Sequence, residues 1–339
     1  MSAFTPHLSR AVSGAPLAPA EMRAAMDALF AGEASDVEIA GFLSALRARG
    51  ETVAEIAAAA QAMRDHAVKV EAPKDVIDTC GTGGDGAGTY NISTAAALIA
   101  AGCGVRVAKH GNKAASSKSG SSEVLESLGV KLDIAPERIA ACIEEANVGF
   151  MFAALHHPAM KHVAPVRKAL GVRTLFNALG PLSNPAGATR QVMGVFDRAL
   201  VRPIAEVMPH LGVTRAWVVH GSDGLDELTT TGPSHVASLE DGEVTEFEVT
   251  PEEAGLARAK PEDLAGGDPS ENAAALWRLL EGEKSAYRDI SVLNAAAALI
   301  VAGKADALDA AARLAEKSID TGAAKAALEN LVACSNRRK

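Results

Sequence analysis

Between residues 76 and 220 the chain alternates short β-branched, apolar runs with helical stretches, and this alternation constrains the fold most strongly. The runs cover residues 76–79, 104–108, 148–153, 191–195 and 216–220, and helical patterns include 95–101, 123–128 and 136–146. Such alternation favours a largely parallel sheet, with functional loops at the carboxyl ends of its strands. Residues 236–239 and 244–249 predict an added hairpin.

The first seventy residues lack this alternation and predict three short helices. Ser35 with Glu38, and Thr52 with Glu55, each have the spacing of a capping box, in which the hydroxyl and the carboxylate satisfy each other's free backbone N–H groups. An earlier helix covers about residues 19–30. We therefore expect a small helical domain over residues 1–70 and a larger α/β domain over residues 71–339.

The composition narrows the class of protein. The chain has 339 residues, and 33 Lys and Arg against 42 Asp and Glu give a net charge of −9, which speaks against binding to nucleic acid. The four cysteines are far apart and form no CxxC pair, so a reducing compartment fits best. The N-terminus lacks an apolar signal region and no apolar stretch is long enough for a membrane span. We expect a cytoplasmic protein.

A glycine-rich segment follows the first expected strand, over residues 78–86. Glycines this dense allow backbone N–H groups to converge on an anion. Gly81, Gly83 and Gly86 also match the dinucleotide fingerprint, but no acidic residue lies about 20 residues further on to bind a ribose hydroxyl. A nicotinamide-dependent dehydrogenase is therefore a weaker interpretation, and a mobile turn is the alternative for the loop taken alone.

Two further segments favour an anion site. Residues 91–94 read Asn-Ile-Ser-Thr before a helix, where hydroxyls and the helix N-terminus can bind phosphate and one hydroxyl can ligate Mg²⁺; simple N-capping is the alternative. Residues 109–113 and 116–122 then bring three lysines and five hydroxyls to the end of the second strand, a local cationic pocket in an acidic chain. A solvated basic loop is the other interpretation.

Two more segments carry candidate charges. Residues 155–168 hold three histidines without zinc-site spacing, and they end near Arg167, which can present a guanidinium fork to a carboxylate. Asp226 and Glu227 follow the fifth strand, and adjacent carboxylates near a phosphate pocket suit Mg²⁺. A surface arginine and a solvated acidic turn remain the alternatives.

Together these segments resemble the anthranilate phosphoribosyltransferases, from about Pro19 to the C-terminal helices. The shared motifs, in order, are GTGGDG from Gly81, NIST from Asn91, KHGN from Lys109, SSKSGS from Ser116, HHPAMKHVAPVRKALGVRT from His156, FNALGPLSNP from Phe176 and GLDEL from Gly224. Each motif is weak alone, whereas seven in order are highly specific. The resemblance implies transfer of phosphoribose to anthranilate in tryptophan biosynthesis.

The resemblance also implies which residues bind each substrate. For phosphoribosyl pyrophosphate they are Gly81, Gly84, Asp85, Thr89, Asn91, Ile92, Ser93, Thr94, Lys109, His110, Gly111, Asn112, Lys113, Ala114, Ala115, Ser116, Ser117 and Ser121. For anthranilate they are Gly81, Asn112, His157 and Arg167, with Arg167 meeting the carboxylate. The implied Mg²⁺ ligands are Ser93, Asp226 and Glu227. Lys113 stands where the family commonly has Arg, so the charge is kept and the bidentate fork is lost.

The fold implied by the resemblance is a small helical domain joined by a cleft to a larger α/β domain, with helices around residues 158–180 rejoining the small one, usually in a homodimer. The chemistry agrees, since Mg²⁺, Lys109 and backbone N–H groups would stabilise a pyrophosphate leaving group. No residue stands out as a general base; His110 and His157 are candidates by proximity only. A pyrimidine-nucleoside phosphorylase and a catalytically silent nucleic-acid-binding relative are the rival interpretations.

Overall fold

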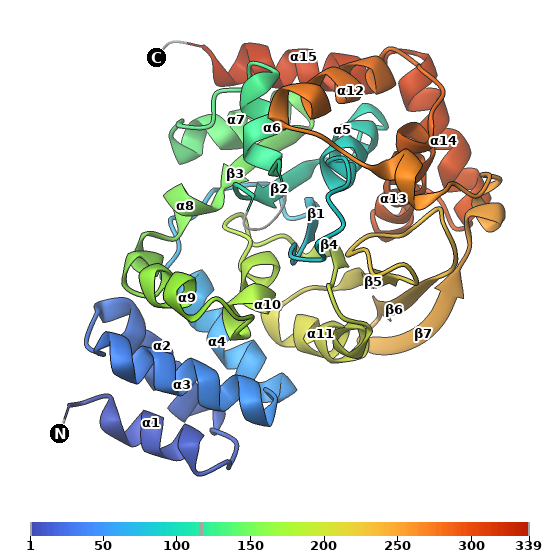
Figure 1. Cartoon of the computed structure of the whole chain (residues 1–339). Helices are drawn as coiled ribbons and strands as arrows, with labels where there is room; N and C mark the ends of the chain where they lie inside the picture. Colours follow the sequence, from blue (N-terminus) through green and yellow to red (C-terminus); the bar gives the residue numbers. More distant parts are fainter. Residues whose placement is uncertain (1, 115–117, 338–339) are drawn as a thin grey trace.

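A computed structural model describes residues 2–114 and 118–337, and its centre is a seven-stranded sheet (Figure 1). The strands are β1 (Ile77–Gly81), β2 (Val107–Gly111), β3 (Val148–Phe152), β4 (Arg190–Gly194), β5 (Arg215–Gly221), β6 (Ser234–Glu240) and β7 (Glu243–Val249). Their spatial order is β3-β2-β1-β4-β5-β6-β7. The first five are parallel, and β6 and β7 form the expected antiparallel hairpin.

The strand order reverses beside β1, because β2 lies on one side of it and β4 on the other. In an open α/β sheet, chains leaving the carboxyl ends of two such strands diverge and open a crevice between them. The glycine-rich segment continues beyond β1, and residues 226–227 follow β5, which lies next to β4 on the same side of β1. The topology therefore brings these two distant segments to one edge of the sheet.

Helices cover both faces of the sheet. In the larger part of the chain they are α5 (Ile92–Gly102), α6 (Ser121–Ser127), α7 (Pro136–Ala146), α8 (Ala153–His156), α11 (Val201–Val207), α12 (Pro269–Leu280), α13 (Ala286–Val301), α14 (Leu308–Asp320) and α15 (Ala323–Ser335). Short 3-10 helices are η1 (Pro158–His162), η2 (Arg198–Leu200), η3 (Met208–Leu211), η4 (Pro251–Ala254) and η5 (Pro261–Leu264). Side chains alternate between the faces: Trp217 packs with α5 and α13, and Val218 with α11.

The N-terminal helices form a separate layer at one end of the molecule (Figure 1). They are α1 (Thr5–Val12), α2 (Pro19–Ala31), α3 (Asp36–Arg49) and α4 (Val53–Asp65). Two later helices, α9 (Ala164–Leu170) and α10 (Leu175–Leu182), lie beside them and share their hydrophobic core. That core includes Phe42, Val166 and Leu179. Segments more than one hundred residues apart in sequence thus bury one common apolar surface.

The sequence predicts three helices over residues 1–70, whereas the described part of this segment has four. Helix α1 was missed because its eight residues carry little propensity and it is held by tertiary packing. Phe4, just before α1, is fully buried and meets Phe42 edge-on, with ring centroids 5.3 Å apart. Both predicted capping boxes are confirmed at the starts of α3 and α4.

Strand β2 also begins three residues later than the pattern predicts. Gly104 has a φ of +76° and donates its N–H to Ala101 O, so it ends the turn after α5 instead of starting the strand. Lys109 and His110, expected in a loop, therefore belong to the strand itself. Their side chains are buried, with exposed fractions of 2% and 4%.

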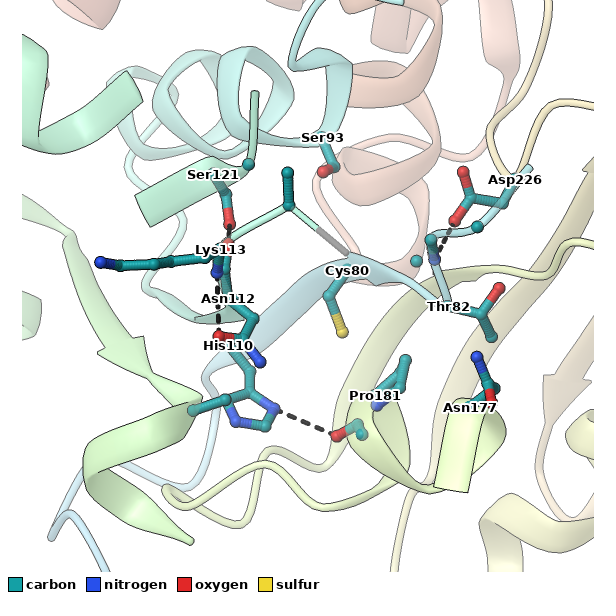
Figure 2. A pocket seen from close by; sticks show the side chains of 18 of the residues that line it. Cys80, Thr82, Ser93, His110, Asn112, Lys113, Ser121, Asn177, Pro181 and Asp226 are labelled. Carbon is teal, nitrogen blue, oxygen red and sulfur yellow. Dashed lines mark hydrogen bonds between the residues drawn. The ribbon is translucent and has the colours of Figure 1, made fainter. Parts of the chain in front are cut away.

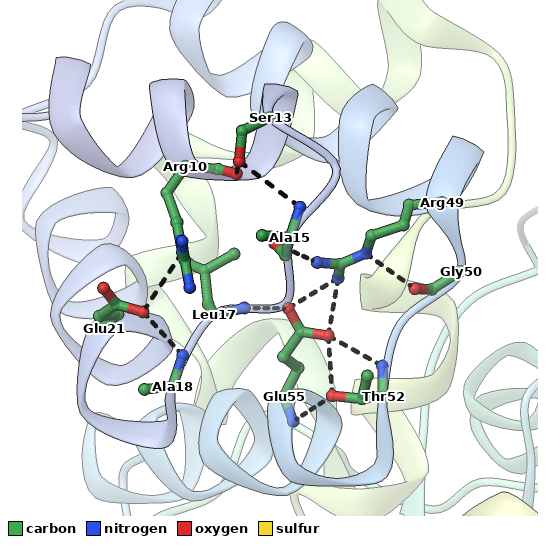
Figure 3. A network of polar contacts seen from close by, with 10 residues as sticks. All are labelled: Arg10, Ser13, Ala15, Leu17, Ala18, Glu21, Arg49, Gly50, Thr52 and Glu55. Atoms are coloured by element: carbon green, nitrogen blue, oxygen red, sulfur yellow. Dashed lines mark hydrogen bonds and ion pairs between the residues drawn. The ribbon is translucent and has the colours of Figure 1, made fainter.

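One capping box is also the centre of a buried ionic network (Figure 3). The Glu55 carboxylate is fully buried and accepts hydrogen bonds from Leu17 N at 2.8 Å, from Thr52 N at 2.9 Å and from Arg49 Nη2 at 2.6 and 2.7 Å. These bonds tie the loop between α1 and α2 to the start of α4. Burial opposes the charge, yet Arg49 and the backbone donors leave the pKa of Glu55 below its ordinary value.

We expect Glu55→Gln to destabilise the protein by about 2 kcal/mol, because it removes the charge from a buried, charge-assisted network. Urea unfolding measures this change. The matched control is Glu21→Gln, since Glu21 holds the same capping position in α2 but its side chain is 47% exposed. The control should cost less than about 1 kcal/mol. Equal losses in the two variants would contradict the role assigned to burial.

Nowhere in residues 2–114 and 118–337 does a helix combine the length and the apolar character that crossing a bilayer requires.

Candidate active site

A cavity of about 510 Å³ opens at the carboxyl ends of β1, β2 and β5, and faces the layer that contains α4, α9 and α10. Figure 2 shows it from close by: the labelled Asp226 side chain points toward the glycine-rich segment after β1, with Ser93 across from it at the start of α5. His110 and Asn112 form the opposite wall, at the end of β2. The crevice expected from the strand order is therefore a real pocket.

Most of the candidate site residues gather around this cavity. Those that line it are Gly81, Gly84, Asn91, Ile92, Ser93, Thr94, Lys109, His110, Gly111, Asn112, Lys113, Ala114, Ser121, His157, Arg167, Asp226 and Glu227. Asp85 and Thr89 do not line it: Asp85 accepts a hydrogen bond from Ala87 N at 3.2 Å, and Thr89 forms a β-bridge with Ala265. Ala115, Ser116 and Ser117 lie outside the described residues.

The start of α5 provides anion-binding groups. The pattern places the helix at Ala95, but it begins at Ile92, so Ser93 and Thr94 lie in its first turn. Ile92 N donates to Tyr90 O and Thr94 N donates to Asn91 O, which leaves Ser93 N at the helix start to bind negative charge. Ser93 N donates to Glu227 Oε1 at 3.2 Å, so a carboxylate of the loop after β5 occupies this position.

Lys109 reaches the same place from β2. Its Nζ donates to Thr79 O and, at 3.2 Å, to Ser93 Oγ. Lys109 lines the cavity although it is only 2% exposed, and these two oxygen atoms hold its ammonium group in place. A buried cation of this kind can stabilise negative charge on a ligand above it.

Asp226 is buried, and Glu227 next to it is partly buried. Asp226 Oδ2 accepts from Gly83 N at 2.6 Å, and a side chain at Gly194 would overlap the Asp226 backbone. Burial and the neighbouring carboxylates raise the pKa of Asp226 well above its usual range. Burial also raises the pKa of Glu227 to about 7, and Asp85 adds to this while Lys109 opposes it.

These residues fit a bound Mg²⁺ ion. Ser93 Oγ and the two carboxylates are hard oxygen donors, and burial with mutual repulsion leaves Asp226 and Glu227 in need of positive charge. In the described part of the chain, no three His, Cys, Asp or Glu side chains form a ready-made cage. A site with few protein ligands suits Mg²⁺, which keeps several waters and completes its shell with substrate phosphates.

The side of the cavity next to the helical layer combines one cation with an apolar wall. The Arg167 guanidinium lies over the Phe176 ring, 5.4 Å from its centroid, and burial lowers the pKa of Arg167. Met63 and Met160 also line this wall. An apolar surface beside a guanidinium suits a small aromatic carboxylate.

Several lining residues were not predicted from the sequence, among them Met63, Cys80, Thr82, Gly83, Met160, Phe176 and Asn177. Phe176 and Asn177 begin one of the shared motifs, so a signal was present without a role attached to it. Met63 lies in the last turn of α4, an Ala-rich helix of the N-terminal layer, and its sequence context carries no signal of a site.

Two buried histidines, His110 and His157, line the cavity. His110 Nδ1 lies 3.1 Å from Gly180 O, and the rings of His110 and His157 meet edge-on with centroids 5.2 Å apart. Burial, with the neighbouring histidines, holds the pKa of His110 well below its ordinary value. Burial lowers the pKa of His157 to about 4. Both rings are neutral near pH 7.

This burial makes the protein sensitive to acid. Since His157 has a pKa of about 4 when folded and about 6.5 when unfolded, the unfolded chain binds more protons between these values, and stability falls as the pH drops. We expect wild type to lose about 2 kcal/mol more than His157→Gln between pH 7 and pH 5. Urea unfolding at both pH values measures the difference.

The control for this measurement is His210→Gln, because His210 is exposed. That variant should lose as much stability at pH 5 as wild type does. An identical acid dependence in wild type and His157→Gln would refute the assignment.

Comparisons with known proteins agree with this geometry. Residues 5–67 match the helical bundle domain of a glycosyl transferase family, and residues 73–325 match the a/b domain of the same family. An anthranilate phosphoribosyltransferase from Parvibaculum lavamentivorans is 60% identical over 336 residues, which is 99% of this chain and 98% of that protein. One from Chelativorans sp. is 57% identical over the full length of both chains.

Solved structures give the same result. The anthranilate phosphoribosyltransferase of Thermus thermophilus superposes with a TM-score of 0.93 at 48% identity, covering 98% of this chain and 99% of its own. The Saccharomyces cerevisiae enzyme in complex with PRPP and Mg superposes with a TM-score of 0.90 at 27% identity, covering 98% and 97%. With this identity, coverage and fold, the chain belongs to the anthranilate phosphoribosyltransferase family.

Proposed function

We propose that this chain transfers the 5-phosphoribosyl group of phosphoribosyl pyrophosphate to the amino group of anthranilate, giving N-(5-phosphoribosyl)anthranilate and pyrophosphate in L-tryptophan biosynthesis. The observation that carries the proposal is one cavity with two different ends. One end gathers Lys109, the start of α5 and a glycine-rich loop, which suit phosphates. The other places Arg167 beside an apolar wall, which suits an aromatic carboxylate.

Mg²⁺ is part of this proposal, and Ser93, Asp226 and Glu227 would hold it. When bound, Mg²⁺ neutralises negative charge on the pyrophosphate group. A Saccharomyces cerevisiae relative has been solved with PRPP and Mg, which supports this assignment. The pairing of Glu227 with the first turn of α5 supports it too, because this contact joins the carboxylate pair to the proposed phosphate site.

The chain's own residues act mainly by binding and orienting the two substrates. Lys109 and the N–H groups of the glycine-rich loop bind the leaving pyrophosphate, on which negative charge develops. Arg167 binds the carboxylate of anthranilate and turns its amine toward the ribose. An aromatic amine is a nucleophile in its neutral form, so attack requires no strong base, and orientation supplies much of the rate.

The rival functions fit less well. A pyrimidine-nucleoside phosphorylase takes no carboxylate substrate, so it gives Arg167 no role at the cavity wall. A nucleic-acid-binding relative would be expected to carry positive charge, whereas this chain has a net charge of −9. The relatives described above are anthranilate phosphoribosyltransferases over nearly the full length of the chain.

Three further properties belong to the proposal. The enzyme is a cytoplasmic homodimer, and its small domain is discontinuous, with α9 and α10 joining residues 1–70. The packing of α9 against α3, and of α10 against α3 and α4, supports the domain division. Four free cysteines suit a reducing compartment. Light scattering after size-exclusion chromatography tests the dimer.

The activity is tested directly by mixing the protein with Mg²⁺, anthranilate and phosphoribosyl pyrophosphate. Anthranilate fluorescence should fall with time, and omission of Mg²⁺ should slow the loss. A well-folded protein that leaves the fluorescence unchanged under all these conditions would refute the proposed function.

A further inference from the structure

Helix α13 lies behind the candidate active site, and none of its residues lines the cavity. Two of its polar side chains, Tyr287 and Asn294, are nevertheless bonded to backbone groups of the segments that form the site. Their exposed fractions are 3% and 2%. Because they are seven residues apart, they lie on one face of the helix, two turns from each other.

Asn294 holds the backbone that follows the carboxylate pair. Its Oδ1 accepts from Leu228 N at 3.0 Å, and its Nδ2 donates to Leu228 O at 2.8 Å. The same Nδ2 donates to Ile290 O at 2.9 Å, which fixes the direction of the amide. Leu228 is fully buried and directly follows Glu227, so its peptide sets where the two carboxylates leave the backbone.

Tyr287 holds the other segment. Its hydroxyl donates to Asn91 O at 3.2 Å, and its ring stacks on Tyr90 with centroids 4.4 Å apart. Asn91 is the residue before α5, so this contact fixes the helix start that presents Ser93. The Ser93 N to Glu227 Oε1 hydrogen bond then joins the two segments inside the site.

A buried phenol and a buried amide are suited to holding backbone groups in this way. Around Asn294 α13 is apolar, with Val292, Leu293 and a run of alanines from Ala295, and Tyr287 lies at its polar first turn. A buried amide or phenol in such a helix is unfavourable unless its polar atoms are bonded. Here the bonded partners are backbone groups of the site instead of neighbouring side chains, and a rigid buried helix keeps them at a constant separation.

We propose that Tyr287 and Asn294 are positioning residues that set the separation between the start of α5 and the Asp226–Glu227 pair, and thereby the Mg²⁺-dependent binding of phosphoribosyl pyrophosphate. This inference rests on the proposed function, which assigns Ser93, Asp226 and Glu227 to Mg²⁺. Mutation of residues that hold metal ligands in place commonly lowers metal affinity by about tenfold to a hundredfold.

The test uses Asn294→Leu, which has a similar volume and can neither donate nor accept a hydrogen bond. Calorimetric titration with phosphoribosyl pyrophosphate at a series of Mg²⁺ concentrations measures binding without turnover. The Mg²⁺ concentration for half-maximal binding should rise by about tenfold to a hundredfold. The KM for anthranilate should stay unchanged, because Arg167 lies on α9. Tyr287→Phe keeps the stacked ring and should give a smaller shift in the same direction.

Ser291→Ala is the matched control. Ser291 is fully buried on the same helix, and its Oγ donates only within α13, to Tyr287 O at 2.7 Å. This variant should lower Tm without changing the Mg²⁺ dependence. Should Asn294→Leu fail to fold, an unchanged Tyr287→Phe would overturn the inference.

The outcomes separate this inference from the proposed function. If wild type binds phosphoribosyl pyrophosphate independently of Mg²⁺, the proposed metal site fails, and this inference fails with it. If wild type depends on Mg²⁺ but Asn294→Leu behaves like Ser291→Ala, only the positioning role is overturned.

Discussion

Replacing Asp226 by Asn and Glu227 by Gln together is expected to lower kcat/KM by about a hundredfold to a thousandfold, because the leaving pyrophosphate loses its charge stabilisation. The Mg²⁺ concentration for half-maximal activity should rise in parallel. Stability should not fall, since burial raises the pKa of both carboxyl groups and neutral amides relieve their repulsion. Anthranilate fluorescence at varied Mg²⁺ and thermal unfolding measure the two effects.

The control for this pair is Asp241→Asn, which neutralises an exposed carboxylate in the turn between β6 and β7. Asp241 has a φ of +50°, a conformation that Asn adopts readily, so the turn should be retained. This variant should keep full activity and the wild-type Mg²⁺ dependence. An unchanged Mg²⁺ titration in the double variant would refute the metal assignment.

Arg167→Ala is expected to raise the KM for anthranilate by about a hundredfold, equivalent to about 3 kcal/mol, while the KM for phosphoribosyl pyrophosphate changes little. The physical reason is that the guanidinium is partly desolvated against Phe176 and available to a ligand carboxylate. Steady-state kinetics with each substrate varied in turn measures this separation.

Lys168→Ala is the matched control for Arg167. Lys168 is the next residue of α9, carries the same charge and is exposed outside the cavity lining. Its loss should leave both KM values unchanged. Equal effects of Arg167→Ala on the two KM values would contradict the role of Arg167 as the carboxylate ligand.

Much of this fold could be predicted because its signals are local. The capping boxes at Ser35 and Thr52 depend on contacts three residues apart, and both are present. The alternation of strands and helices predicted the parallel sheet, and the hairpin followed from its turn. Helix α1 was not predicted, because Phe4 beside it is held by the distant Phe42. The predicted start of β2 was wrong, because Gly104 ends the turn after α5.

The candidate active site shows the same difference between local signals and distant contacts. Glycines after β1, hydroxyls in the first turn of α5 and a carboxylate pair after β5 are sequence-local features, so these residues of the cavity lining could be predicted. The apolar wall could not, because Met63 belongs to an Ala-rich helix and reaches the cavity only through the packing of two layers. The contacts of Tyr287 and Asn294 were equally hidden, since they join residues separated by 196 and 66 positions.

Local sequence patterns were thus enough to predict most of the elements and the family of this protein, because hydrogen bonds, periodicity and motifs within a few residues encode them. Which side chains share one cavity, how deeply Lys109 is buried and what holds the carboxylates in place depend on tertiary packing. That packing joins segments whose separation in sequence leaves no local pattern to read.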